Sequence, residues 1–219
     1  MNRSESVSFK KNWKAAWGSV SQRTLMLTGS AVVAVILSAM PFFFKHIELR
    51  PGIQIHDFVL SRIPAHNVSL FIFLIIWSMG LLTLVRAIQT PGVYVRYIWL
   101  YSLICLTRLL TITLVPLAPP AGWLELVDPL TGVFYGHSII TKDLFYSGHT
   151  STLVAMYFCL PKKSDRILAV LATIIVGCLL LVQHIHYTID VLAAPVFVYL
   201  LNQVVKSTIF INKGSNASK

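Results

Sequence analysis

Charged side chains are scarce in this sequence. Only 12% of its 219 residues are Asp, Glu, Lys or Arg, whereas 56% are hydrophobic. Soluble globular domains carry about 25% charged residues, so this composition excludes a soluble domain. No long polar linker and no internal repeat interrupts the chain, which favours one domain. We therefore predict a polytopic membrane protein.

Acidic residues and cysteines are also few. The eight Asp and Glu residues are too scattered to build a two-metal phosphatase site, and we expect neither a metal nor another cofactor. The three cysteines lie inside apolar runs, without the spacing of metal ligands or the loop positions that suit disulfides. We interpret them as small core residues.

Apolar runs of the length needed to cross a bilayer, about 17–25 residues, recur along the chain. We expect all of them to be helices, because backbone polar groups in lipid must be satisfied within the segment. The predicted fold class is all-α, with a six-span catalytic membrane domain over residues 25–205. The predicted spans are Leu25–Phe44, Val68–Val85, Val93–Val115, Leu144–Leu160, Ile167–Gln183 and Tyr187–Val205.

The net charge is +10. A nucleic-acid binder concentrates its basic residues on one soluble face, whereas these are distributed among loops between apolar runs, so we expect no nucleic-acid partner. Of the 18 Lys and Arg residues, thirteen fall on the amino-terminal side of the predicted membrane and four on the opposite side. This bias predicts that both termini are cytoplasmic. The remaining residue, Arg108, lies within the third span.

Residues 1–24 and 206–219 flank the predicted membrane domain. In the first segment Phe9, Trp13, Ala16, Trp17 and Val20 recur at helical spacing, with lysines between them. This pattern is typical of an amphipathic helix on the inner membrane surface; the alternative is a polar tail with chance aromatics. The last segment is predicted to be a cytoplasmic polar tail.

Titratable residues gather on the predicted outer face, which would be periplasmic or lumenal. Ser147 is a natural N-cap for the fourth span, and Gly148 lets a ligand approach the backbone closely. The start of a helix offers free N–H groups and a positive dipole end, which suit a phosphate. His149 follows, where it could protonate a leaving oxygen.

The stretch QHIHYTIDV places two more histidines at the same face. His186 and Asp190 are four residues apart, so on a helix they share one side. A carboxylate there can fix the tautomer of the ring and leave its other nitrogen as a base or nucleophile. His184 is off that side. The alternative interpretation is a polar pair that stabilises helix packing.

Arg108 needs a partner inside its apolar run, and phosphate is the planar, bidentate one that Arg suits best. Asp143, Asp190 or a backbone carbonyl is the alternative. Together with His149 and the His186–Asp190 pair, Arg108 would complete the parts of phosphoryl transfer through a phosphohistidine.

These motifs resemble the lipid phosphate phosphatase and phosphotransferase superfamily (type 2 phosphatidic acid phosphatases). The finer pattern is similar to the sphingomyelin synthase branch, which has an Asp before Ser-Gly-His-Thr and a later His-x-His-Tyr-Thr-x-Asp-Val. The matching residues here are Arg108, Thr111, Asp143, Ser147–Thr150 and His184–Val191. The sequence departs from that branch at Thr141-Lys142, where the animal enzymes have Cys-Gly, and at Pro195, where an aromatic residue is usual.

The resemblance implies a transfer of a phosphocholine or phosphoethanolamine headgroup from a glycerophospholipid to ceramide or a diacylglycerol-like alcohol. His186 would be the nucleophile, Asp190 would orient it, and His149 would act as acid and then as base. The implied substrate-binding residues are Arg108, Asp143, Ser147, Gly148, His184 and Tyr187. The alternative is a lipid phosphate phosphatase or phospholipase C-like hydrolase with the same site. A transporter or scaffold of this fold is a third interpretation, and a homo-oligomer is compatible with each.

Overall fold

The regular elements of the protein are helices. The computed structural model describes residues 3–126 and 140–210, and within these ranges the all-α prediction is confirmed. The elements are α1 (Arg3–Gly18), α2 (Val20–Glu48), the 3-10 turn η1 (Leu60–Arg62), α3 (Ser69–Gln89), α4 (Pro91–Leu114), α6 (Gly148–Cys159), α7 (Lys163–Val182), α8 (Thr188–Val205) and the π turn η2 (Lys206–Phe210).

Among the described residues five helices are long and apolar enough to cross a membrane, namely α2, α3, α4, α7 and α8 with its extension to Ile209. This agrees with an integral membrane protein. The first of them is longer than predicted. It begins at Val20, inside the segment expected to precede the membrane domain, because Ser19 accepts a hydrogen bond from Gln22 N (3.5 Å) as the N-cap.

The predicted count of six spans is not confirmed. In place of the fourth span, Leu144–Leu160, the structure has α6, which is only 12 residues long. Such a helix extends about 18 Å, well short of the roughly 30 Å of a hydrocarbon core. Irregular backbone is tolerated at membrane depth where protein buries it, and α6 contacts four other helices, α3, α4, α7 and α8.

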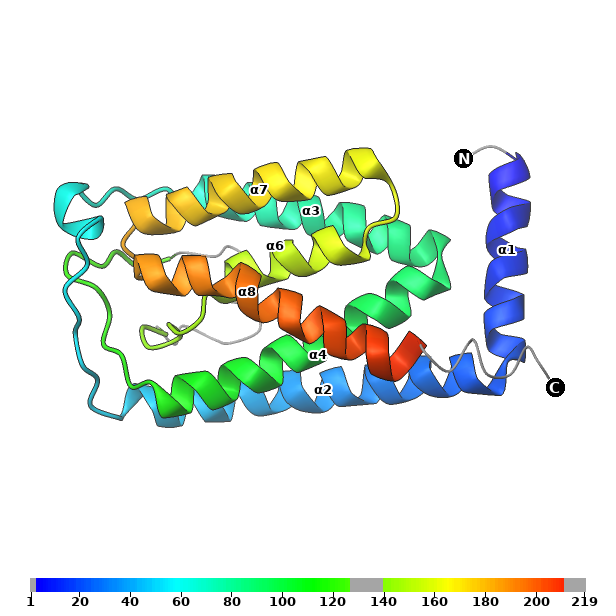
Figure 1. The fold of residues 1–219 in the computed structure, drawn as a ribbon, viewed down its shortest axis with the longest axis horizontal. Coiled ribbons are helices and arrows are strands. Elements are labelled where there is room, and N and C mark those ends of the chain that lie inside the picture. Colours follow the sequence, from blue (N-terminus) through cyan, green and yellow to red (C-terminus); the bar gives the residue numbers. More distant parts are fainter. Residues whose placement is uncertain (1–2, 127–139, 211–219) are drawn as a thin grey trace.

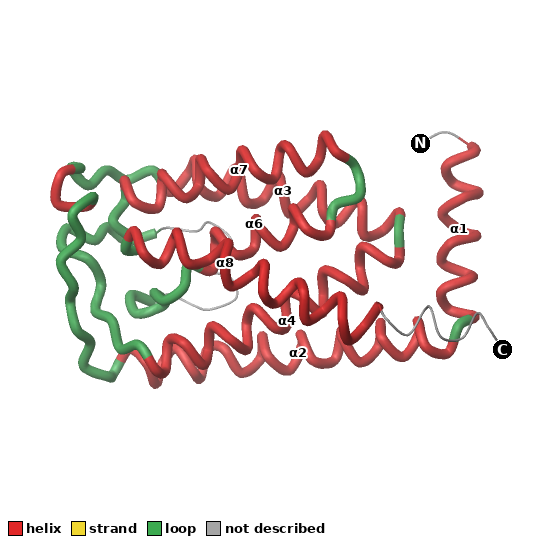
Figure 2. Tube along the Cα trace, viewed as in Figure 1, coloured by secondary structure: helices red, strands yellow, loops and turns green. Residues whose placement is uncertain are grey.

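The long helices run alongside one another, and α6 lies among them (Figure 1). The loops that join α2 to α3 and α7 to α8 gather at one end with the described residues between α4 and α6, and we call it the loop end (Figure 2). Helix α1 and the last turns of α8 lie at the opposite end, which we call the terminal end (Figure 1). The topology therefore brings segments that are far apart in sequence to the same end of the bundle.

The core surrounds α6. Leu153 and Met156 of this helix pack with Ile72 of α3 and Val176 of α7. On its other side Val154, Ala155 and Cys159 pack with residues of α4 and α8. Because α6 is enclosed, we expect its first turn to hold a fixed position relative to the ends of α4 and α8.

The outlying helices are α1 and α2. Helix α2 packs against α4, and α1 runs across the terminal end of the bundle instead of along it (Figure 1). In α1 Ala16 is buried and Trp13 donates from Nε1 to the carbonyl of Ile88 (2.6 Å), whereas Trp17 is 45% exposed. The location of α1 on a membrane surface stays a prediction.

Candidate active site

The first turn of α6 is organised by Ser147, as predicted. This residue is the N-cap, and its hydroxyl oxygen accepts from Thr150 N (3.4 Å) and Thr150 Oγ1 (3.1 Å). Its own backbone N–H donates to the carbonyl of Asp190 (3.1 Å). The start of α6 is therefore joined directly to the first turn of α8.

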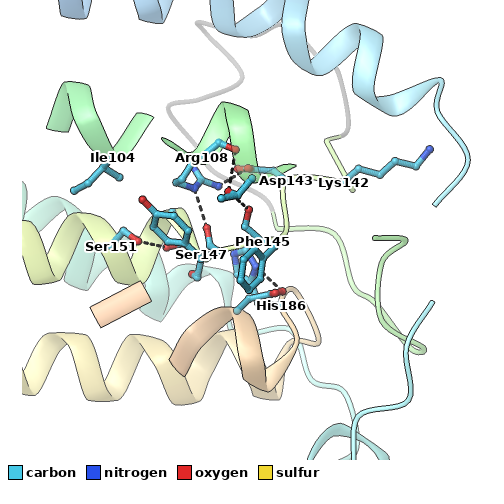
Figure 3. A network of polar contacts seen from close by, with 12 residues as sticks. Ile104, Arg108, Lys142, Asp143, Phe145, Ser147, Ser151 and His186 are labelled. Carbon is cyan, nitrogen blue, oxygen red and sulfur yellow. Dashed lines mark hydrogen bonds and ion pairs between the residues drawn. The ribbon is translucent and has the colours of Figure 1, made fainter. Parts of the chain in front are cut away.

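Arg108 reaches this turn from α4. Its side chain is buried, with Nε donating to the carbonyl of Tyr146 (2.9 Å) and Nη2 paired with the Asp143 carboxylate. Figure 3 shows the guanidinium pointing toward Asp143 and the backbone before α6. Of the possible partners for this residue, the structure thus gives Asp143 and a carbonyl. This pairing compensates the buried charge but leaves further donors on the guanidinium.

Gly148 is required by the position of Arg108. A Cβ atom on this residue would lie 2.6 Å from Cζ of the guanidinium, which is closer than non-bonded carbons approach. The sequence predicted that a ligand approaches the backbone at Gly148, whereas in the structure the Arg108 guanidinium lies there. The guanidinium and the N-terminal end of α6 together form a positively polarised corner that suits an anion.

His186 and Asp190 are close neighbours, but not on one helix. His186 Nδ1 lies 3.6 Å from Asp190 Oδ2, and both side chains are almost completely buried. Helix α8 begins only at Thr188, because the Asp190 carboxylate accepts from Tyr187 N (3.0 Å) and closes the turn there. The two side chains are therefore neighbours, as their spacing predicted, but His186 precedes the helix instead of lying on it.

The polar atoms between His186 and Asp190 are unusual. His186 Nδ1 and Asp190 Oδ1 are buried, and neither has a hydrogen-bond partner among the described residues. Their side chains are already within 3.6 Å, so a small shift of the imidazole would form a direct hydrogen bond. Catalytic hydrogen bonds are often long before a substrate binds and tighten in its presence.

His149 faces His186 from the first turn of α6. The ring centroids of the two histidines are 6.3 Å apart in an edge-to-face arrangement. On its other side His149 packs against Phe73 of α3, with 6.2 Å between ring centroids. A phosphorus atom placed between two imidazoles at this separation would be within reach of both, which is the arrangement that nucleophile and proton donor need.

His184 and Tyr187 direct their polar atoms toward loops. The His184 ring nitrogens contact the carbonyls of Ala121 (2.7 Å) and Ile63 (3.0 Å), and the residue adopts φ = 56°. Tyr187 donates its hydroxyl to the carbonyl of Ala118 (2.9 Å). Burial raises the pKa of this phenol, so it stays a neutral donor. Both predicted substrate-binding residues therefore have structural partners in this conformation.

Three residues that sequence reasoning missed hold the site in place. Glu48, at the end of α2, accepts from the backbone N–H groups of Thr141 (2.7 Å) and Lys142 (2.8 Å) and so fixes the segment before Asp143. Gln183 is fully buried and accepts from Val68 N (3.1 Å).

Asp57 is the third of these residues. Its carboxylate accepts from Thr188 N (2.7 Å) at the start of α8. Burial opposes its ionisation, but hydrogen bonds from Thr188, Leu60 and Val59 outweigh burial and lower the pKa of Asp57. The partner of each missed residue is far away in sequence, so no local pattern marks them.

The assembled groups can carry out group transfer to and from a phosphate. Arg108 and the start of α6 offer positive charge, and two imidazoles face one another with a carboxylate beside one of them. Among the described residues no three His, Cys, Asp or Glu side chains are placed to hold a metal ion. The two imidazoles and the carboxylate offer nucleophilic and acid–base catalysis.

A comparison with known families gives one match. Residues 142–208, just under a third of the chain, match the family model "PAP2 superfamily C-terminal". The matched segment contains Asp143, His149, His186 and Asp190, whereas Arg108 lies before it. No curated protein matches the chain. Over this segment the chain is therefore similar to the PAP2 superfamily, and the similarity includes Asp143, His149, His186 and Asp190 of the predicted site.

Proposed function

We propose that the protein is a lipid headgroup phosphotransferase. It would move a phosphocholine- or phosphoethanolamine-type headgroup from a glycerophospholipid to ceramide or a similar lipid alcohol. The observation that carries the proposal is the convergence of Arg108, His149 and His186 at the loop end of a membrane-spanning bundle. With both termini cytoplasmic, this end would be the outer face, periplasmic or lumenal.

In the first step His186 Nε2 attacks the phosphorus atom of the donor lipid. The bond from phosphorus to the glycerol oxygen breaks, and this oxygen takes a proton from His149, so that diacylglycerol leaves. Asp190 compensates the positive charge that develops on the His186 ring, which its distance of 3.6 Å allows. Arg108 and the N-terminal end of α6 stabilise the phosphate oxygens.

In the second step the acceptor hydroxyl gives its proton to His149, which was left neutral by the first step. The hydroxyl oxygen attacks phosphorus, the P–N bond to His186 breaks, and both histidines return to their starting states. The same residue thus acts as acid and then as base, as the reverse directions of proton transfer require.

The charges around the site favour a phosphodiester over a phosphomonoester. Arg108 is already paired with Asp143, and Asp190 adds a second carboxylate beside His186. A lipid phosphate with a dianionic headgroup would meet these two carboxylates with one guanidinium to offset them. A phosphodiester carries one negative charge and meets less repulsion. This argument supports headgroup transfer over dephosphorylation of a lipid phosphate.

Burial of the reacting groups favours a lipid alcohol over water as the acceptor. His186 and Ser147 are 1% and 0% exposed, and Phe73 covers one side of His149. A site that excludes bulk water protects a phosphohistidine from hydrolysis until an acceptor arrives.

The test is an assay of the full-length protein in lipid nanodiscs with phosphatidylcholine or phosphatidylethanolamine labelled in the headgroup, with and without ceramide. We expect labelled phosphosphingolipid and diacylglycerol in equal amounts, no product from His186→Ala, and an acid-labile headgroup adduct on His186 of the wild type. His66→Ala is the matched control, because this histidine is exposed at the same end. Full turnover by His186→Ala would refute the assignment, and headgroup release that does not depend on an acceptor would favour the hydrolase.

A further inference from the structure

The loop between α2 and α3, residues 49–68, follows the turn between α7 and α8, residues 183–187, and bonds to it along its length. His66 N donates to the carbonyl of Val182 (3.0 Å), just before the turn. Ile55 N donates to the hydroxyl of Tyr187 (3.3 Å). The carbonyl of Ile63 contacts His184, and Val68 N donates to Gln183. This loop is therefore a strap over the turn that carries His186.

Asp57 is the strongest attachment of the strap. One carboxylate oxygen accepts from Thr188 N (2.7 Å), and the other accepts from Thr188 Oγ1 (3.0 Å). The second oxygen also accepts from Val59 N (2.9 Å) and Leu60 N (3.2 Å), which start the turn η1. A single side chain thus binds the start of the turn η1 and the start of α8, where Thr188 lies 131 residues after Asp57.

The position of Asp57 is favourable in charge as well as in geometry. Thr188 is the first residue of α8, and the backbone N–H groups there have no partner within the helix. A carboxylate at this end also interacts favourably with the helix dipole. Hydrogen bonds to ionised groups are the stronger kind. The bond from Thr188 therefore fixes where the helix begins.

His186 lies two residues before this anchor. The described hydrogen bonds of the strap go to Val182, to Gln183 and His184, and to Tyr187 and Thr188. None of them goes to His186, whose ring remains available to the site. The strap thus fixes the backbone on both sides of His186, while the imidazole makes no bond to the strap and can react.

We propose that Asp57 is a positioning residue that sets the location of the His186 imidazole through its bonds to Thr188. This inference rests on the proposed function of His186 as nucleophile. Without the carboxylate, the start of α8 and the preceding turn would move away from Arg108 and the N-terminal end of α6, where the phosphate is proposed to bind. A displacement of about 1 Å at a reacting group can reduce the rate roughly 100-fold. Substrate binding at Arg108 would change little, because the strap reaches α4 through Arg50, whereas the hydrogen bonds of the Asp57 carboxylate go to Thr188, Val59 and Leu60.

The test compares Asp57→Asn with the wild-type protein in the headgroup-transfer assay. The amide keeps the shape of the side chain but puts an NH2 group where one carboxylate oxygen accepts. We expect kcat, divided by the amount of enzyme that can be trapped as phosphohistidine, to fall at least tenfold while KM for the donor stays within twofold. Amide hydrogen exchange over residues 183–190 should accelerate. Ser61→Ala is the matched control, since this hydroxyl bonds only within the strap, to the carbonyl of Phe58.

Two substitutions of Thr188 complete the design. Thr188→Val removes the bond from Oγ1 and should lower kcat in the same way but less, whereas Thr188→Ser should restore wild-type rates. If Asp57→Asn does not yield folded protein, Thr188→Val decides, and a wild-type kcat for it overturns the proposal. Wild-type kcat for Asp57→Asn would overturn it too, provided that His186→Ala is inactive. Full activity of His186→Ala would instead overturn the proposed function itself.

Discussion

Substitution of Gly148 by Ala tests whether the position of the Arg108 guanidinium beside α6, where the phosphate is proposed to bind, limits the rate of headgroup transfer. The added Cβ would lie 2.6 Å from Cζ of Arg108, and relaxed carbon contacts are about 3.5–4.0 Å. The guanidinium must therefore retreat by about 1 Å. It cannot do so without stretching its bonds to Tyr146 and Asp143.

A retreat of this size has a predictable cost. A misplacement of about 1 Å can lower the rate roughly 100-fold, which corresponds to about 2.7 kcal/mol in the activation free energy. Stability should change less than activity. Weakening one buried, charged hydrogen bond costs roughly 1.5–3 kcal/mol, whereas replacing Gly by Ala in a helix returns up to about 1 kcal/mol.

The assay is headgroup transfer by Gly148→Ala in nanodiscs, together with thermal unfolding of the same samples. Gly80→Ala in α3 is the matched control, because a Cβ there has no neighbour within 4 Å. We expect this control to keep wild-type activity and to be slightly more stable. If Gly148→Ala has the wild-type kcat, the position of the Arg108 guanidinium does not limit the reaction and the proposed phosphate site beside it is wrongly assigned.

Three further predictions concern stability. Ser147→Ala removes the acceptor for Thr150 N and should cost about 1 kcal/mol of unfolding free energy, whereas Ser147→Asp should keep most of it; thermal unfolding measures both. At the terminal end Arg86 binds Asp165 through two bonds (2.7 and 3.3 Å), so Arg86→Ala should destabilise by about 1.5–3 kcal/mol without lowering kcat, and a double-mutant cycle with Asp165→Asn should show strong coupling. The pKa of Asp57 is lowered on folding from its usual 3.8, so the stability that its ionised form contributes is present above this value and is lost as the pH falls below 3.8 and through the lower pKa of the folded state. The melting temperatures of wild type and Asp57→Asn should therefore differ most at neutral pH and converge in acid; a constant difference would contradict this.

Hydrophobic length predicted the long helices well, because a run of about 20 apolar residues has few other stable conformations. It failed at α6. The stretch from Leu144 to Leu160 is apolar enough to read as a span, but the four helices around α6 remove the need for one continuous helix. The local sequence does not show that neighbouring helices will surround a segment and separate it from lipid.

Local chemistry predicted part of the site. The cap at Ser147 follows from its own residue type and its position before an apolar run. For His186 and Asp190 the spacing predicted a contact on a helix, whereas Asp190 bonds to Tyr187 N and makes the helix begin after His186. The two groups still meet, because the turn before α8 folds back over its first residues.

The support of the reactive turn could not be predicted at all. Asp57 lies in the loop between α2 and α3, where its residue type alone predicts an ordinary turn residue, and its partner Thr188 is 131 residues away. Glu48 is likewise 93 residues from Thr141. Such pairs depend on which loops the helix packing brings to one end, and this becomes visible only in three dimensions.

The arrangement separates the residues that we propose to react from those that hold them. His149, His186 and Arg108 sit on or beside the ends of buried helices, where packing limits their movement. The loops at the same end supply carboxylates to the backbone: Glu48 to the segment before Asp143, and Asp57 to the start of α8. Each of these carboxylates accepts hydrogen bonds from backbone N–H groups, and neither is paired with Arg108. Among the described residues, the carboxylate that pairs with Arg108 is that of Asp143. In the proposed reaction an entering phosphodiester would bind to this pair without breaking a larger network of ion pairs.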